Sequence, residues 1–328
     1  MDTTTSYMGI QLPNPFIAGV PLQGDTLDIV RQVEDAGGAA IVLPPLFEEE
    51  LQKEALATHF STESHAHFFA EAMSFFADHE DFVLGPEEYL EHTRKIKEAV
   101  NIPIIASLNG HTMLGWKDYA KRIEQAEPDA LELDFYYVPT DVDESGEAIE
   151  QTGVNIVTEV REAIKLPLGV KLSPFFTSLA HFAGRLERVG AGGIVIFNRF
   201  YEADIDVEEL EVMSRPSLSF HGELLLRLRW LALLSGNVNC SLAATGGVHT
   251  AVDAVKAVMA GANVVQMVSI LKKRGFECLT QIRQEFAEWL ERHEYESLEQ
   301  MHGSMNIRRC PDPEMFQRIN YMNIMQTW

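Results

Sequence analysis

The chain has 328 residues and a formal net charge of −23, and 46% of its residues are hydrophobic. This length suits one large domain with a sizeable core, whereas the acidic charge argues against nucleic acid or an anionic membrane as a partner, because both require a basic face. The three cysteines are too few and too scattered for a disulfide framework or a Cys-rich metal site.

The beginning of the chain carries no recognisable targeting signal. Residues 1–7 are polar, and no apolar run reaches the length of a bilayer span. We therefore expect a cytoplasmic protein without a membrane segment. An anionic ligand would need a local basic patch, because the overall field of the protein is negative.

Eight short apolar runs alternate with amphipathic helical patterns along the chain. Each run is bounded by Gly, Pro or Asn and is apolar on both faces, as strands of a parallel sheet are. Eight such units predict an α/β fold, a (β/α)8 TIM barrel, more readily than a doubly wound sheet. The predicted strands are 17–21, 39–45, 103–109, 130–137, 167–174, 192–199, 239–247 and 263–270, and the helices lie near 25–36, 86–100, 117–127, 150–164, 177–189, 222–235, 250–260 and 273–293.

Three segments fall outside this repeat but belong to the same predicted domain, residues 1–328. Residues 5–16 suggest a short N-terminal hairpin that could plug the bottom of the barrel. Residues 46–85 form a long insertion after the second strand, which either covers a site or packs on the barrel as decoration. The C-terminal extension, 294–328, has an apolar stripe at helical spacing, which favours a packing or dimer element, so a homodimer is one expected assembly.

The stretch from 241 to 269 contains the most informative local signal. Thr245-Gly246-Gly247 ends a predicted buried strand, and a helical pattern begins directly afterwards. Paired glycines allow close backbone approach, and a helix N-terminus favours an anion, most often a phosphate. A second strand ends near Ser269, and two such turns late in a chain match the phosphate site of a TIM barrel. The alternative is an ordinary αβα unit with a glycine cap.

Polar residues also end several other predicted strands. Lys171 lies inside an apolar strand, where a lysine is costly unless it meets an anion or a ligand acceptor, or extends to the rim. Asn109 and Asn198 offer amide donors and acceptors, although either could simply cap a loop. Asp134 either pairs with Lys171 or accepts a ligand hydroxyl. Together with the phosphate site, these groups suit a planar, phosphorylated cofactor such as FMN.

These residues resemble the dihydroorotate dehydrogenase family, which consists of FMN-dependent (β/α)8 barrels. The likeness runs from Asn14-Pro15-Phe16 to about residue 303 and is strongest at 169–176, 244–248 and 261–267. The resemblance implies FMN bound by Ala18, Gly19, Asn109, Lys171, Asn198, Gly246, Gly247 and Ser269. The neighbouring Asp134, Thr245 and Met267 complete the expected cofactor-binding set.

The chain departs from this family where the family handles its substrate. After the fourth strand the family has an Asn-x-Ser motif followed by a Cys or Ser base, but residues 134–140 here contain no such base. Leu43-Pro44-Pro45 replaces a family lysine, and the family's substrate-binding Asn loop is not recognisable within 64–82. The chain is thus similar to a divergent, dihydroorotate dehydrogenase-like branch. Flavin binding is expected to persist, orotate chemistry is not, and a role in pyrimidine biosynthesis stays open.

We therefore expect an FMN-dependent oxidoreductase that acts on CH–CH bonds. It would move a hydride between flavin and a small polar substrate other than dihydroorotate. Tyr136 and Tyr137 are the candidates for proton transfer, as base or as donor, and Arg199 is a neighbour that could lower a tyrosine pKa. Lys171 completes the catalytic set. Both tyrosines could instead be packing residues beside the flavin.

Two other functions remain open from the sequence. One is a non-catalytic or flavin-free interaction protein with a decayed barrel site. The other is a phosphosugar aldolase or isomerase in which Lys171 forms a Schiff base. In the insertion, His65, His67 and His79 are expected to be solvated or lid residues, because a spacing of two does not place two histidines on one helical face. No metal is expected.

Overall fold

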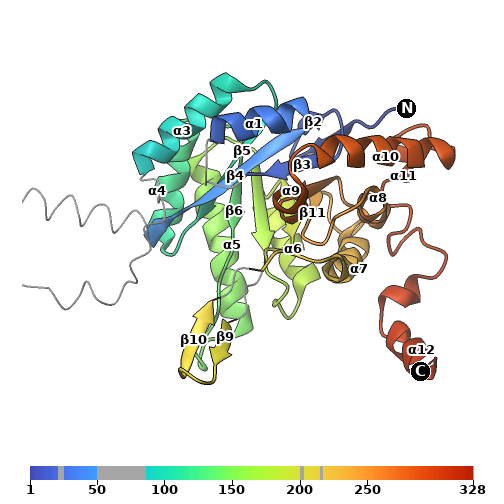
Figure 1. The fold of residues 1–328 in the computed structure, drawn as a ribbon. Coiled ribbons are helices and arrows are strands. Elements are labelled where there is room, and N and C mark those ends of the chain that lie inside the picture. The colour runs from blue at the N-terminus through green and yellow to red at the C-terminus, as the bar shows by residue number, and fades with distance from the viewer. Residues whose placement is uncertain (21–25, 50–85, 200–202, 215–216, 328) are drawn as a thin grey trace, which may run out of the picture.

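The computed structural model describes residues 1–20, 26–49, 86–199, 203–214 and 217–327. Eight parallel strands form a closed barrel in the order β11-β12-β3-β4-β5-β6-β7-β8, and helices alternate with them along the chain (Figure 1). The prediction of a (β/α)8 barrel is confirmed. The strands are β3 Phe16–Gly19, β4 Ala40–Phe47, β5 Ile104–Asn109, β6 Ala130–Asp134, β7 Leu168–Leu172, β8 Gly193–Ile196, β11 Ser241–Thr245 and β12 Val264–Met267.

The helices begin and end where the sequence provides caps. Helix α8 follows Thr250, whose side chain accepts the N–H of Asp253 while Asp253 reciprocates, and it ends at Gly261, which adopts a φ of 121°. Thr112 and Ser145 cap α4 and α5 through their side chains. The helices are α1 Thr26–Asp35, α3 Pro86–Ala99, α4 Met113–Glu124, α5 Gly146–Ala163, α6 Leu179–Arg188, α7 Leu224–Leu234, α8 Ala251–Ala260, α9 Ser269–Arg274 and α10 Cys278–Arg292.

Side chains along each barrel strand alternate between the interior and an outer layer under the helices. On β6, Leu131 and Leu133 belong to the outer hydrophobic cluster, whereas Ala130 belongs to a separate interior cluster. The same alternation directs Glu132 and Asp134 into the barrel. The fold therefore places two carboxylates, one above the other, on the inner wall of a closed sheet.

The N-terminal hairpin closes one end of the barrel, as predicted. Strands β1 Thr5–Tyr7 and β2 Ile10–Leu12 pair antiparallel, and Tyr7 and Met8 are buried in the interior cluster. They pack where Gly169 and Gly193 lie near the amino ends of β7 and β8. A Cβ at Gly193 would lie 2.9 Å from Met8 Cγ and 3.3 Å from Tyr7 Cε2. The missing side chains thus make room for the plug.

Several local predictions differ from the structure. The single helix predicted near 273–293 is divided at Gly275 into α9 and α10. Strand β6 ends at Asp134, so residues 135–137 form a loop instead of the predicted strand, and α9 begins at Ser269 within the predicted strand 263–270. An antiparallel hairpin of β9 Ala203–Asp206 and β10 Glu211–Ser214, drawn in yellow in Figure 1, was not predicted. Acidic and apolar residues alternate over 204–207 and again over 209–212, and this period-two signal indicates the two strands.

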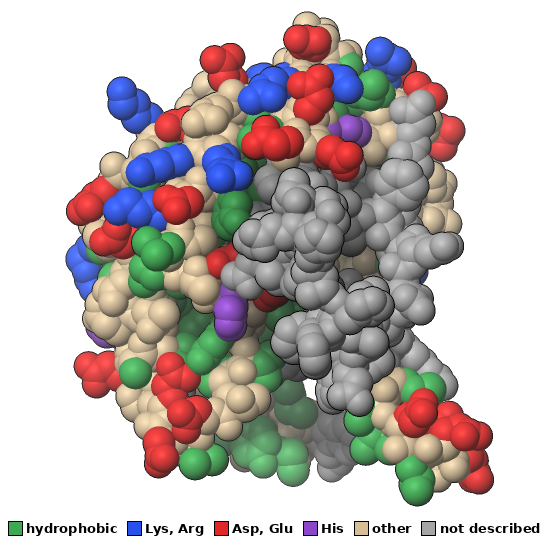
Figure 2. All heavy atoms as spheres, turned by 90° about the vertical axis from the view of Figure 1, so that its left-hand side faces the viewer, with side chains coloured by type: hydrophobic (Ala, Val, Ile, Leu, Met, Phe, Trp, Pro, Cys, Tyr) green, Lys and Arg blue, Asp and Glu red, His purple; other side chains and the backbone are tan. Residues whose placement is uncertain are grey.

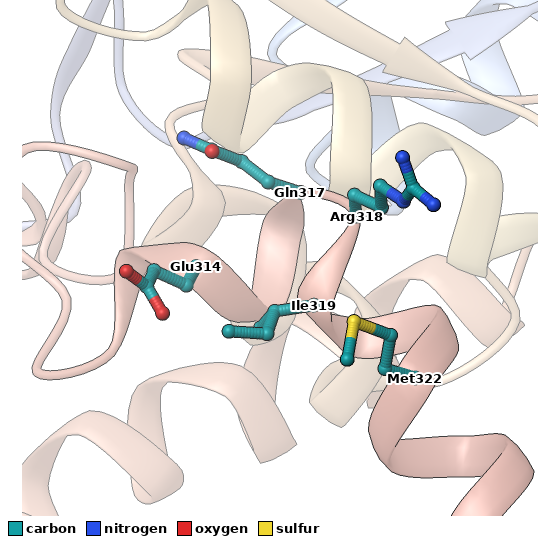
Figure 3. A pocket seen from close by; sticks show the side chains of 5 residues that line it. All are labelled: Glu314, Gln317, Arg318, Ile319 and Met322. Carbon is teal, nitrogen blue, oxygen red and sulfur yellow. The ribbon is translucent and has the colours of Figure 1, made fainter.

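The long insertion and the C-terminal extension are the two segments that follow or interrupt the barrel repeat. Most of the insertion, 50–85, lies outside the described residues. The extension contains α11 Leu298–Met301, the 3-10 helix η3 Pro313–Phe316 and α12 Ile319–Gln326. A pocket of about 280 Å³ lies on this extension, and it is lined by Glu314, Gln317, Arg318, Ile319 and Met322 (Figure 3). Across the described residues, no helix has the length and apolarity needed to cross a bilayer.

Substituting Gly193 tests the packing of the plug. Gly193→Val is expected to lower the free energy of unfolding by about 1–3 kcal/mol, because added carbons overpack a filled core. The measurement is urea-induced unfolding. Gly184→Ala in α6 is the control: its Cβ would approach no atom closer than 3.8 Å, so it should stabilise by about 0.5–1 kcal/mol through helix propensity. Equal stability of Gly193→Val and the unsubstituted protein would contradict the packed plug.

Candidate functional site

The carboxyl ends of all eight strands meet at one end of the barrel, because the strands are parallel. Most of the predicted site residues come together there. Gly19 ends β3, Asn109 ends β5, Asp134 ends β6 and Thr245 ends β11. Residues more than 200 positions apart in the chain therefore share one mouth, opposite the end that the hairpin closes.

Lys171 lies between two carboxylates of the neighbouring strand. Its Nζ is 3.5 Å from Glu132 Oε1 and 3.5 Å from Asp134 Oδ2, and its side chain is only 18% exposed. Asp134 and Lys171 are direct partners in the register of β6 and β7. The structure thus decides a question that the sequence left open: Asp134 pairs with Lys171, and the lysine does not extend into solvent.

The two strand-end amides hold Asp134 in place. The Asn198 side-chain amide donates a hydrogen bond to Asp134 Oδ1. The Asn109 amide donates to the backbone carbonyl of Asp134 at 3.0 Å. Three predicted residues from β5, β6 and the end of β8 therefore form one hydrogen-bonded unit beside Lys171.

Burial and charge act in opposite directions on the ionisable groups of this unit. Burial raises the pKa of Glu132 and of Asp134, although the charge of Lys171 opposes that rise. For Lys171, burial alone would lower the pKa, but Asp134 and Glu132 together outweigh it and raise the pKa above its ordinary value. The lysine is consequently held in its cationic form.

The predictions above do not include Glu132 and Gln266, which lie deeper in the barrel. Glu132 is fully buried, and its Oε2 accepts a hydrogen bond of 2.6 Å from Gln266 Nε2. The signal in the sequence is the order Glu132-Leu133-Asp134, since strand alternation puts both acids on the face that also carries Lys171. An acid two residues from a site carboxylate could therefore have been found.

Four polar groups converge on Ser219 beside the ends of β11 and β12. The Gly247 N–H donates to Ser219 Oγ at 3.3 Å, and Ser269 Oγ accepts the Ser219 N–H at 2.9 Å. Lys273 Nζ donates to the Ser219 carbonyl at 2.7 Å, and His249 Nε2 is 3.3 Å from Ser219 Oγ. Figure 2 shows acidic side chains interspersed with Lys and Arg over one face of the protein.

The paired glycines have positive φ angles, and neighbouring groups leave no space for a side chain at Gly247. Gly246 and Gly247 have φ angles of 83° and 82°. A Cβ on Gly247 would lie 2.5 Å from the Leu224 backbone nitrogen. Arg227 Nε donates to the Thr245 carbonyl at 2.8 Å and so fixes the turn from behind. Ser219, Lys273 and Arg227 were outside the predicted set, and no local motif marks them.

The two candidate tyrosines lie on the loop after β6, toward solvent. The Tyr137 hydroxyl donates to Glu144 Oε2 at 2.7 Å, and this hydrogen bond raises the pKa of Tyr137. The Tyr136 side chain is partly exposed. Arg199 forms an ion pair of 2.6 Å with Glu223. A tyrosine that acts as a base needs a lowered pKa, whereas Glu144 raises the pKa of Tyr137.

The remaining predicted residues lie apart from this arrangement to different degrees. The side chains of Ala18 and Met267 belong to the outer hydrophobic cluster between barrel and helices, so only their backbone atoms can reach the mouth. Within the described ranges, no group of three His, Cys, Asp or Glu side chains is placed to hold a metal ion. The three histidines of the insertion lie outside the described residues.

Removing the ammonium tests the electrostatics of the site. Lys171→Met should lower the free energy of unfolding by about 3–5 kcal/mol at pH 8, because two buried carboxylates lose their counter-ion. Acids whose folded-state pKa exceeds the unfolded value bind more protons when folded, so stability falls as pH rises above about 4. The loss should accordingly be smaller at pH 5 than at pH 8 in denaturant titrations. Lys97→Met, which breaks the more exposed pair with Asp129, is the control. A pH-independent loss would contradict the assignment.

The sequence of the chain is similar to a known family and to several known enzymes. A family model described as dihydroorotate dehydrogenase matches residues 83–290. The chain is 22% identical over 345 residues to the NAD-dependent dihydropyrimidine dehydrogenase subunit PreA of Escherichia coli (strain K12), with 97% of this chain and 82% of that protein covered.

Two further relatives are dehydrogenases of shorter overlap. The catalytic subunit of dihydroorotate dehydrogenase B (NAD(+)) from Geobacillus sp. (strain WCH70) is 26% identical over 187 residues, covering 55% of this chain and 59% of that protein. Dihydroorotate dehydrogenase (fumarate) from Lachancea kluyveri is 31% identical over 162 residues, covering 46% and 51%. Because the family model spans more than half of the sequence, the chain belongs to the dihydroorotate dehydrogenase family.

Proposed function

We propose that residues 1–328 form a single FMN-binding barrel domain that acts as an oxidoreductase on CH–CH bonds. Its substrate is a small polar molecule other than dihydroorotate, because the loop after β6 lacks the family's Cys or Ser base. The observation that carries the proposal is the buried ammonium of Lys171, held cationic at the mouth of the barrel. The relatives, which are dehydrogenases of dihydroorotate or dihydropyrimidine, support the reaction class.

The chemistry of the donor set at the mouth fits FMN at both of its ends. The Gly247 N–H, the Ser269 hydroxyl and Lys273 are the kinds of groups that bind a phosphate, and they already converge on one residue. A fixed cation such as Lys171 suits the negative charge of a reduced flavin ring. The other groups we assign to the cofactor are Gly19, Asn109, Asp134, Asn198, Thr245 and Gly246, with the backbone of Ala18 and Met267.

When bound, FMN supplies the transfer of a hydride to or from a substrate carbon. The chain must then handle the accompanying proton. Tyr137 keeps its proton, because the hydrogen bond to Glu144 raises its pKa. We therefore infer that Tyr137 acts as a proton donor in the reduction of a C=C bond, with Tyr136 lining the same loop.

The structure weakens the Schiff-base alternative. A lysine that forms a Schiff base must be able to lose its proton, whereas Asp134 and Glu132 raise the pKa of Lys171.

The proposed enzyme is compatible with a homodimer. Helix α12 has no buried residues and exposes Tyr321, Met322, Ile324 and Met325, and we propose it as the contact in a homodimer.

The cofactor proposal is tested by colour and by one substitution. The purified protein should be yellow or take up added FMN, and heat should release FMN identifiable by chromatography. It should not oxidise dihydroorotate at about 1 per second or faster, a rate typical of enzymes. Lys273→Met should weaken FMN binding about tenfold through loss of a charge-assisted hydrogen bond, yet leave riboflavin binding unchanged. Lys272→Met on the same helix is the control, and a colourless protein that binds no FMN would refute the proposal.

The proton-donor assignment is tested by removing one hydroxyl. Tyr137→Phe should retain FMN but reduce the rate of substrate-dependent flavin reoxidation by about 10²-fold or more, the usual contribution of a positioned general acid. The assay is a screen of unsaturated and dihydropyrimidine compounds with stopped-flow detection. Tyr136→Phe is the matched comparison on the same loop. If both variants react at the unsubstituted rate with an accepted substrate, the tyrosines are packing residues.

A further inference from the structure

The interior of the barrel below Lys171 contains polar atoms that the proposed chemistry does not use. Glu132 is fully buried, and its two carboxylate oxygens have different surroundings. Oε2 accepts the hydrogen bond from Gln266, whereas Oε1 has no hydrogen-bond partner among the described residues. Oε1 instead forms the ion pair with Lys171, at 3.5 Å from Nζ.

Two neighbours of Glu132 are also buried and lack a hydrogen-bond partner within the described part of the chain. Ser107 is the direct partner of Glu132 in the register of β5 and β6, and its Oγ is unpaired. The unpaired hydroxyl of Tyr7 comes from the hairpin plug, and burial followed by the charge of Glu132 raises its pKa. Neither group therefore forms a hydrogen bond with Glu132 Oε1, the oxygen that pairs with Lys171.

Stability alone does not explain a second carboxylate at this place. One carboxylate, Asp134, already neutralises Lys171, so Glu132 leaves the buried group with an excess negative charge when all three are ionised. Buried ion pairs are commonly no more stable than apolar residues of the same size. Because stability does not account for a buried acid at this position, we look for a functional role of Glu132 at the site.

Depth separates the roles of the two acids. Asp134 ends β6 at the mouth, and its Oδ1 accepts a hydrogen bond from Asn198, a residue we assign to the cofactor, so a bound cofactor would act on Asp134 directly or through Asn198. Glu132 lies two residues deeper and is inaccessible to a ligand at the mouth. It can therefore hold Lys171 whether or not Asp134 is engaged.

We propose that Glu132 is a positioning residue for Lys171, with Gln266 fixing its carboxylate so that Oε1 anchors the ammonium at the mouth. The anchor keeps the cation in place and charged when a ligand draws Asp134 away. This inference rests on the proposed function, in which Lys171 faces the flavin. Its role is distinct from that of Asp134, because Glu132 acts only through the lysine.

The test measures Lys171 itself instead of turnover. The full-length chain, as purified and after saturation with FMN, is labelled competitively with acetic anhydride between pH 7 and pH 11, and the peptide containing residue 171 is quantified by mass spectrometry. Only the neutral amine reacts. The groups facing it are Glu132 and Asp134 on β6, with Tyr7 behind Glu132. Glu132→Gln is nearly isosteric and should accelerate labelling at pH 9 by about tenfold or more. Removing the carboxylate beside the buried lysine lowers the pKa of Lys171, so more of the amine is neutral.

Two further variants make the result specific. Glu150→Gln removes another nearly buried carboxylate, which pairs with Arg185 on α6, and it should leave Lys171 labelling unchanged. Glu132→Asp keeps the charge but withdraws it by one methylene, so labelling should rise by a smaller factor. It also serves as the test if Glu132→Gln does not fold, which circular dichroism would reveal.

The outcomes separate this inference from the proposed function. If the chain binds FMN but folded Glu132 variants label like the unsubstituted protein, the positioning role is refuted and the function stands. If the variants change the labelling profile but no flavin binds, the anchor stands as a property of Lys171 and the function fails.

Discussion

The site depends on one constraint: a lysine ammonium must be accommodated inside a closed sheet. Strand alternation sends Lys171, Glu132 and Asp134 to the inner wall of the barrel, where water cannot compensate their charges. The three groups stabilise each other only because β6 and β7 are adjacent and in register. The amides of Asn109 and Asn198 then fix Asp134 from two further directions. The geometry of the mouth follows from satisfying these buried charges.

The barrel separates its two ends and divides the mouth into two parts. At the amino ends of the strands, Tyr7 and Met8 fill the space left by inward-facing glycines. At the carboxyl ends, the wall formed by β6 and β7 carries the cation with its two acids. The turns after β11 and β12 carry donors suited to an anion, which converge on Ser219. A ligand that is anionic at one end and accumulates negative charge at the other matches both parts.

The strongly acidic composition does not conflict with an anionic ligand, because the decisive charges are local. The ammonium of Lys273 lies within hydrogen-bond distance of Ser219, whereas the distant acids of the surface are screened. The loop after β6 differs in character from the turns after β11 and β12. The loop after β6 presents tyrosines, and Glu144 holds a proton on Tyr137. The proposed cofactor site therefore rests on more contacts in this chain than the proposed substrate site does.

Hydrophobic periodicity and the positions of Gly, Pro and Asn were enough to predict the barrel, the N-terminal hairpin, the paired glycines and the strand-end residues. These features follow from local rules of alternation, capping and turn conformation. The β9–β10 hairpin carried a period-two signal as well, but it lies outside the βα repeat. The sequence also singled out Lys171 as a lysine that needs a partner. It did not decide that the partner is a pair of acids, that Gln266 fixes the deeper one, or that Ser219 meets Gly247, Ser269 and Lys273. Those contacts join residues separated by 28 to 134 positions, and only closure of the barrel brings them within hydrogen-bond distance.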